Sequence, residues 1–577
     1  MRKLRFLCTL ASLLIVSGLY AQVKVSGKVT DAGTGAGLPG VSVKVKGGDQ
    51  GTSTGDDGSF SLDVPANAKV LEFSYVGYAS AEQAIGKSFM AVKMNLEARN
   101  LEEIVVTGYG SQIKRELTGN IARVKGKEIE NMPTPSVDQA LQGKAAGVYV
   151  NSQSGKLGQA VTVRVRGNSS ISASSQPLFV VDGIPITTQD QSSYGGDMNP
   201  LVDLNPNDIE SIEILKDASA GAIYGSRAAN GVVLITTKRG KAGRTQVSAN
   251  FQGGFSEATR RVRFLNAEEY ATMFLQATGW YDNRFGIDPN DPSSETSWAK
   301  DWMNYNSFGQ WATNPKASYD WQDQAFQRGG YKQADLQITG GNDKTKFFAS
   351  AQHLDQVGTI IGNNLNRTSG RLTVDHKAYD WLTVGLSMNL ARTYNRRLPD
   401  DNAFSNPLQS VALMPVTPFT DPNTGLPTGT PPGDVNLPLY YNPRITVDYG
   451  KFGQEVFRNF TNAYLTAKLV HGLTFTSEFG MDLLSQNEES YFQNQTVRNQ
   501  TRATNGLGQN YSAFVANYNT NNYFSYRNEF GKHSVDATLG MGYQESTSKY
   551  SFTEGLDFPS NSYQKIASAA TKSGGSS

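Results

Sequence analysis

The sequence has few of the residues that build most catalytic and metal centres. Its single cysteine, Cys8, lies near the start of the chain, and its four histidines (His353, His376, His471 and His533) are far apart. Beyond Cys8 the chain can form no disulfide, thiolate nucleophile or cysteine-ligated metal site, and the histidines form no HExxH pair. We therefore predict a protein that is not an enzyme and has no catalytic residue, metal or cofactor.

Charge and long apolar runs are also scarce. Charged residues make up 18% of the chain, and its 53 bases, three of them within the first 21 residues, nearly balance 52 acids. This balance gives no case for a nucleic-acid partner. After the N-terminal stretch no apolar run reaches the ~20 residues that a membrane helix needs. A membrane-spanning form would have to be a β-barrel, because only helices and closed barrels satisfy every backbone group in lipid.

The chain opens with a leader pattern over residues 1–21. Three bases come first, an apolar stretch follows over residues 6–16, and Ala21 is the small residue at its end. This order is typical of a cleaved secretory signal peptide. We expect an exported protein.

Residues 22–98 alternate short apolar runs with turn residues, which predicts a small β-sandwich. Residues 35–40 fit GxGxxG, but Pro39 interrupts them and a strand follows, so we interpret them as a turn rather than a dinucleotide site. The segment resembles the carboxypeptidase regulatory-like domain, which implies a non-catalytic module. The motifs that carry the resemblance are Gly27-Lys28-Val29-Thr30-Asp31, Leu38-Pro39-Gly40-Val41 and Thr54-Gly55-Asp56-Asp57-Gly58-Ser59-Phe60.

Residues 99–110 form a short extended segment. Acids lead into a β-branched run that stops at glycine, Leu101-Glu102-Glu103-Ile104-Val105-Val106-Thr107-Gly108-Tyr109-Gly110. Such a segment could be an internal strand, or it could add as a strand to the sheet of another protein. It resembles the TonB box of SusC/RagA-type outer-membrane proteins. The resemblance implies that TonB binds at Glu103, Ile104, Val105, Val106, Thr107, Gly108 and Tyr109.

Residues 111–240 resemble the plug domain of the same family at four places in order. These are residues 136–143, 161–167, 179–186 and 204–235, and in the third of them Asp182-Gly183 is a two-residue hairpin turn. The resemblance implies an α+β plug that occludes a barrel. We expect its bases either to contact the barrel wall or to face solvent: Arg164, Arg166, Lys216 and Arg227.

Residues 241–577 show alternating segments, the pattern of outer-membrane strands of ~10 residues. Short and long connections alternate between them, as in barrels whose long loops lie outside the cell. Nine strands are predicted, and the tail 571–577 is not one of them. Nine is an odd number, and the resemblance implies about 22 strands, so we expect an incomplete barrel. The predicted strands are 246–255, 332–341, 344–356, 366–377, 381–394, 455–470, 473–486, 515–530 and 533–546.

Together these patterns predict a mainly β protein with a small β-sandwich, an α+β plug and a partial antiparallel transmembrane β-barrel. The resemblance implies import across the outer membrane of an oligosaccharide or, less favoured, an oligopeptide. Expected partners are proton-driven TonB, a SusD-like surface lipoprotein and outer-membrane lipid, with the N-terminal modules in the periplasm. The alternatives are a siderophore or cobalamin receptor, a sensor acting through an anti-sigma factor, and a secreted carbohydrate-binding or carbohydrate-active protein.

The first long loop is rich in aromatic residues, namely Trp280, Tyr281, Trp302, Trp311 and Trp321. These rings could stack on sugars. Packing within the loop or contact with a partner is the favoured interpretation.

Overall fold

The computed structural model describes most of the chain after the leader and divides it into two compact units. Unit 1 holds residues 1–104 and 113–115, and unit 2 holds residues 105–112 and 116–577. The predicted leader, residues 1–21, lies outside the described residues. The description covers residues 22–577 except 49, 67, 76–77, 87–88, 96–103, 107–110, 114–120, 153, 169, 171–173, 194–195, 218–221, 399–412, 431–441, 495–504 and 532.

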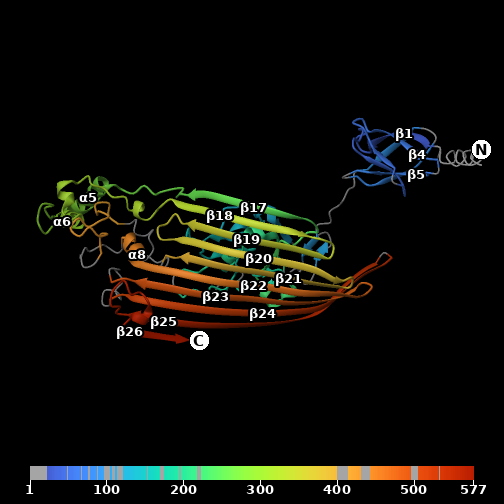
Figure 1. Cartoon of the computed structure of the whole chain (residues 1–577). Coiled ribbons are helices and arrows are strands. Elements are labelled where there is room, and N and C mark those ends of the chain that lie inside the picture. The colour runs from blue at the N-terminus through green and yellow to red at the C-terminus, as the bar shows by residue number, and fades with distance from the viewer. Residues whose placement is uncertain are drawn as a thin grey trace, which may run out of the picture. The chain divides into compact units, whose positions relative to one another are not determined.

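Unit 1 contains the predicted β-sandwich (Figure 1). One sheet has the order β4-β1-β7 and the other the order β3-β2-β5-β6. Alternation explains the core: Phe60, Leu62 and Val64 of β4 point inward between exposed neighbours, and Phe73 packs edge-on against Phe60 with ring centroids 5.5 Å apart. The strands are β1 (Gln22–Asp31), β2 (Ser42–Val45), β3 (Gly51–Ser53), β4 (Ser59–Pro65), β5 (Val70–Ser74), β6 (Ala81–Ala84) and β7 (Met90–Met94).

The plug is the first part of unit 2 and has the predicted α+β character. A five-stranded sheet has the order β10-β15-β16-β13-β14, and β11 and β12 pair separately. Asp182 and Gly183 have φ of 47° and 86°, as a two-residue turn between β13 and β14 requires. The elements are β10 (Ile121–Lys125), α2 (Gly126–Ile129), α3 (Val137–Ala140), β11 (Val148–Ser152), β12 (Val161–Val165), β13 (Leu178–Val181), β14 (Ile184–Pro185), β15 (Ile209–Leu215) and β16 (Val232–Thr237).

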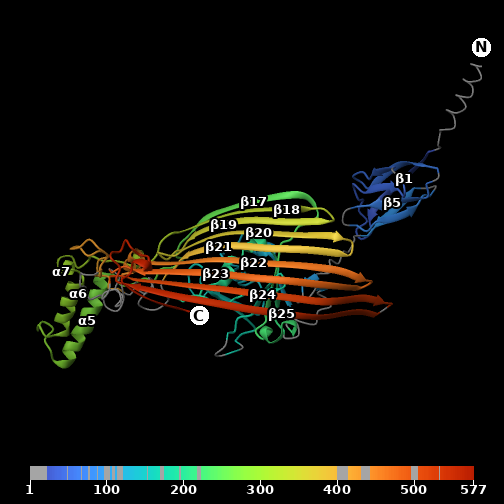
Figure 2. The same ribbon diagram turned by 60° about the horizontal axis from the view of Figure 1, so that its bottom comes forward.

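The rest of unit 2 is one curved antiparallel sheet in which each strand pairs with the next along the chain (Figures 1 and 2). The nine predicted strands are all present, and several extend further toward the long loops. The strands are β17 (Gly243–Ser256), β18 (Gly329–Gly341), β19 (Thr345–Val357), β20 (Asn364–Tyr379), β21 (Leu382–Arg396), β22 (Gly450–Val470), β23 (Leu473–Phe492), β24 (Leu507–Phe530), β25 (His533–Leu556) and β26 (Thr571–Ser576).

The strand β26 corrects the prediction that the tail is not a strand. It pairs antiparallel with the last residues of β25, from Leu556↔Thr571 to Ser551↔Ser576, so the sheet has ten strands rather than nine. The tail has no apolar alternation because Gly574 and Gly575 lie within it. The free edge of β25 offers backbone hydrogen bonds to a strand of any side-chain composition. A prediction from the side-chain pattern therefore missed β26.

The two faces of this sheet differ in polarity, as in outer-membrane barrels. On β20 the side chains of Arg367, Ser369, Arg371 and Thr373 are buried, whereas the alternate Leu372 is exposed. The plug lies on the polar face, on the concave side of the sheet (Figure 2). Exposed apolar side chains on the other face include Leu386, Phe457, Leu465, Phe479 and Leu539.

The loop between β17 and β18 contains helices that the sequence analysis did not predict. They are α5 (Ala267–Phe285), α6 (Glu295–Asn306) and α7 (Gln310–Thr313). The favoured interpretation of the loop aromatics holds for Trp321, which is 1% exposed, while Trp280 is 63% exposed. Among the described helices none is both long enough and apolar enough to cross a membrane.

Candidate functional site at the plug and barrel interface

The plug hairpin at Asp182 is clamped to the sheet by a buried ion pair. Arg371 of β20 donates from Nη2 to Oδ2 of Asp182 at 2.7 Å, and both side chains are at most 2% exposed. Thr237, at the end of the plug sheet, donates to the same carboxylate from its amide N at 3.0 Å and from Oγ1 at 2.6 Å. Burial raises the pKa of Asp182, but nearby Arg371 and Arg239 outweigh it and hold the pKa below its usual range. The carboxylate is therefore charged.

A second arginine of β20 binds the plug through backbone carbonyls. Arg367 is fully buried, and its Nη1 donates to the carbonyl oxygens of Pro135 at 2.7 Å and of Leu204 at 3.3 Å, and also to that of Val202. Its Nη2 donates to Oε1 of Gln352 at 2.7 Å. A buried guanidinium is tolerated only when its donors are satisfied, and here plug carbonyls accept from Nη1 while Gln352 of the wall accepts from Nε and Nη2.

A third arginine, Arg458 of β22, joins two strands and the plug. It forms two hydrogen bonds with Asp482 of β23, each 2.8 Å long, and this fork geometry is the strong form of the ion pair. Its remaining donors reach the carbonyl oxygens of Pro200 at 2.6 Å and Thr187 at 3.2 Å. Arg458 thus ties the plug to the inner face of the barrel sheet.

Two plug acids face hydroxyl groups of the barrel wall. Thr393 Oγ1 donates to Oδ1 of Asp203 at 2.6 Å, and Ser350 Oγ donates to Oδ2 of Asp208 at 2.9 Å. Burial raises the pKa of both aspartates, more than nearby arginines lower it. Of these three plug aspartates, Asp182 is therefore charge-paired, whereas burial disfavours the anions of Asp203 and Asp208.

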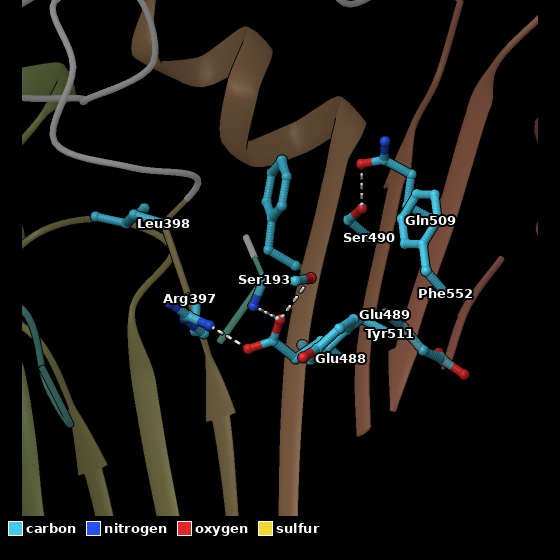
Figure 3. A pocket seen from close by; sticks show the side chains of 11 residues that line it. Ser193, Arg397, Leu398, Glu488, Glu489, Ser490, Gln509, Tyr511 and Phe552 are labelled. Carbon is cyan, nitrogen blue, oxygen red and sulfur yellow. Dashed lines mark hydrogen bonds and ion pairs between the residues drawn. The ribbon is translucent and has the colours of Figure 1, made fainter. Parts of the chain in front are cut away.

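At the end of the sheet that carries the long loops, the wall leaves a cavity of about 360 Å³ (Figure 3). Arg397, just after β21, donates to Oε1 of Glu488 at 2.6 Å, and the plug residue Ser193 donates its amide to Oε2 of the same glutamate at 3.0 Å. Plug and wall thus meet at the cavity. Phe452, Ser490, Gln509, Tyr511 and Phe552 also line it.

The bases predicted to contact the wall behave differently from one another. Arg227 donates to Oε1 of Gln544 on β25, as one of the two interpretations expected. Arg166 instead pairs with Asp217, and Lys216 donates to the carbonyl oxygen of Ala146, both within the plug. The wall provides most of the cations at the interface, which the prediction missed. In the sequence, Arg367 and Arg371 lie four residues apart and so share one face of a predicted strand. This pattern was the available sign that the wall carries cations.

The predicted TonB segment is described in part. Ile104–Val106 is strand β8, and it forms a two-stranded sheet with β9 (Ser111–Ile113). Among the described strands neither has another neighbour. Glu103, Thr107, Gly108 and Tyr109 lie outside the described residues. Within the described part of the chain no three histidine, cysteine, aspartate or glutamate side chains could together hold a metal ion.

Comparison with known proteins agrees with this architecture. Residues 113–232 match the TonB-dependent Receptor Plug Domain, and residues 25–106 match the CarboxypepD_reg-like domain. TonB-dependent receptor P3 of Formosa agariphila is 31% identical over 97% of this chain and 52% of its own length. TonB-dependent receptor SusC of Bacteroides thetaiotaomicron is 32% identical over 71% of this chain and 38% of its own length.

The chain therefore contains the plug domain of TonB-dependent receptors, and SusC is among the receptors that it resembles. The fold agrees: the RagAB peptide importer in its open-open state superposes with a TM-score of 0.67 at 24% identity, over 82% of this chain and 53% of that one. The outer membrane is therefore the location of this SusC/RagA-type chain. It spans about half the length of the curated relatives that it matches.

Proposed function

We propose that this SusC/RagA-type chain serves TonB-dependent import of a nutrient oligomer, an oligosaccharide in the first place and an oligopeptide in the second. A SusD-like lipoprotein would hold the oligomer at the outer face. The observation that carries the proposal is the plug seated on the polar inner face of the sheet, where Arg367, Arg371 and Arg458 bind it. A plug in this position occludes the passage until it moves.

The proposed domain plan is a leader (1–21), a β-sandwich (22–98), a TonB segment (99–110), a plug (111–240) and a partial barrel (241–577). The TonB segment comes directly before the plug in the chain. A pull on it would therefore be transmitted through the backbone to β10, an edge strand of the plug sheet.

Strand addition is the mode of TonB binding that β8 supports. Its one described neighbour is β9, and we expect a strand of TonB to add at its other edge. Glu103 to Tyr109 would make this contact, mostly through backbone hydrogen bonds. Such binding depends on the backbone amides more than on individual side chains.

The polar character of the interface suits a part that must separate. The carbonyls of Pro135, Pro200 and Leu204, which bind wall arginines, can exchange these partners for water. Net hydrogen-bond energies are only ~0.5–1.5 kcal/mol, or ~1.5–3 kcal/mol with a charged donor, because water competes. The interface also has apolar contacts, since Val202 of the plug lies in one buried cluster with Leu354 and Leu365 of the wall. Movement of the plug would therefore expose apolar as well as polar surface.

Deletion of Glu103 to Tyr109 tests the proposal. Uptake of labelled oligomer by cells should be lost while binding at the cell surface is kept. A sharper pair of variants is Val105→Pro, which removes a backbone donor, and Val105→Ala, which keeps it. Uptake should fall with proline and persist with alanine. Unchanged uptake by the deletion variant would contradict the proposal that TonB binds at Glu103 to Tyr109.

A further inference from the structure

The cavity between the plug and strands β21 to β25 has the size of a subsite. Its volume of about 360 Å³ is near the lower end of ligand pockets, which range over ~300–1,000 Å³. Figure 3 shows Arg397 and Leu398 on one side and Gln509 and Phe552 on the other, with Ser193 and Glu488 between them. A cavity of this size suits a ring-sized unit of a longer chain rather than a whole oligomer.

The charged side chains of the cavity wall are already paired with one another or with nearby bases. Besides Arg397 and Ser193, Gln454 donates to Oε1 of Glu488 at 3.1 Å. Glu489 accepts from Nζ of Lys451 and from Nζ of Lys565, each at 3.1 Å. A charged ligand group would have to displace one of these partners, and separating the buried pair of Arg397 and Glu488 would leave an uncompensated charge.

The remaining wall is neutral and amphipathic. Phe452, Tyr511 and Phe552 contribute aromatic rings, and Ser490 and Gln509 contribute a hydroxyl and an amide. Ser490 Oγ lies 3.4 Å from Oε1 of Gln509, a long hydrogen bond that a ligand hydroxyl could replace. In the described part of the chain the Tyr511 hydroxyl has no hydrogen-bond partner, although its ring stacks near Tyr550.

Aromatic rings beside neutral hydrogen-bond donors and acceptors match the chemistry of a sugar ring. A pyranose ring has an apolar face of C–H groups that packs on an aromatic ring, and a rim of hydroxyls that both donate and accept. An oligopeptide carries charged termini and a backbone that prefers a strand edge or paired carbonyl and amide groups. The cavity wall offers it neither a free charge nor a free strand edge, since β21 to β25 are paired side by side.

We propose that this cavity is a binding subsite for one uncharged sugar ring of the imported oligomer. The ring stacks on Phe552 or Tyr511, and its hydroxyls bind the Tyr511 hydroxyl, Gln509 and Ser490. The inference rests on the proposed import function and deepens it, because it assigns the substrate class to named residues at the junction of plug and wall.

The test uses the purified full chain in detergent on an array of neutral oligosaccharides, uronate-containing and sulfated oligosaccharides, and oligopeptides of both charges. Neutral oligosaccharides should bind. Phe552→Ala should weaken this binding by about tenfold, as truncation of a contact ring typically does. Tyr511→Phe, which removes only the hydroxyl, should weaken it by about fivefold.

Matched controls lie on the opposite face of β24. Phe514→Ala and Tyr518→Phe change the same residue types at exposed positions of the outer face, and neutral-sugar binding should not change in either. If Phe552→Ala fails to fold, a comparison of sugar binding by Tyr511→Phe and by Tyr518→Phe still tests the proposal. Preference for charged glycans or peptides, absence of neutral-sugar binding, or equal loss in the controls would overturn the proposal.

Array binding needs no TonB, so the result separates the two proposals. A chain lacking Glu103 to Tyr109 should bind neutral sugars as the parent does. If that chain still imports labelled oligomer, the import proposal fails while the subsite stands. If import needs the segment but the array shows only peptides, the subsite fails alone.

Discussion

The β-sandwich and the plug interface are held together by different mixtures of contacts. The sandwich core is a closed apolar cluster in which Leu71, Phe73 and Met94 are fully buried. The contact between plug and wall instead combines buried ions and backbone carbonyls around Arg367, Arg371 and Arg458 with a smaller apolar cluster around Val202 and Leu354. Apolar burial gives stability, whereas buried ion pairs add little net stability because of their desolvation cost. Under the proposed import function, the comparison implies that the sandwich stays folded while the interface opens.

The largest effect is expected in the sandwich core. Phe73→Ala removes a fully buried ring that contacts Phe60, so the free energy of unfolding should fall by ~3–5 kcal/mol. Urea unfolding of a fragment covering residues 22–95 measures it. Val23→Ala, at a 48% exposed position, is the control and should change little. A loss under about 1 kcal/mol for Phe73→Ala would mean that this cluster is not the core.

Arg371→Ala should have the next largest effect. It leaves buried Asp182 without its ion-pair partner, although Arg239 remains nearby, and loss of a partner costs ~3–5 kcal/mol for such pairs. The lower end is expected because Thr237 still donates twice to the carboxylate. Amide hydrogen exchange over Leu178–Val181 and at Ile184 should then quicken about 100-fold.

The matched control for this pair is Arg527→Ala. Arg527 and Asp536 form the same kind of pair at an exposed position, and exposed pairs contribute only ~0–1 kcal/mol. Exchange around the plug hairpin should therefore stay as in the parent. Equal acceleration by both variants would contradict the role given to the Asp182 clamp.

The smallest effect is a pH dependence of the sandwich. The Tyr78 hydroxyl donates to Asp31 at 2.6 Å and, with amides of Thr34 and Gly33, lowers the pKa of Asp31 from 3.8 to about 2. Because the folded pKa is depressed, the stabilisation is complete above the unfolded value of 3.8 and is lost as the pH falls toward about 2. Asp31→Asn should flatten this part of the stability profile in acid titrations of the fragment. An unchanged profile would contradict the assignment.

Much of the fold was predictable because apolar residues at every second position of a strand indicate which of its faces is apolar. The nine long strands and the hairpin at Asp182-Gly183 follow from such patterns. The strand β26 was missed because Gly574 and Gly575 give no pattern. The helix α5 was missed although Asn266 and Glu269 form a capping box, since the region was interpreted as one long loop.

The site was less predictable than the fold. The TonB segment stays a prediction from its resemblance. The contacts of the plug join residues about 200 positions apart, as Arg371 and Asp182 do. No local pattern specifies such a pair. The alternation on β20 indicates that Arg367 and Arg371 share a face, and only the fold shows that the plug covers it.

The most direct test of the account is a removable link between plug and wall. Asp203→Cys with Thr393→Cys replaces two short side chains whose oxygens lie 2.6 Å apart, in a chain whose single native cysteine, Cys8, lies in the predicted leader. Uptake of labelled oligomer should stop when the disulfide forms and return after reduction, with surface binding unchanged. Full uptake with the link verified on a gel would contradict the claim that this interface must open.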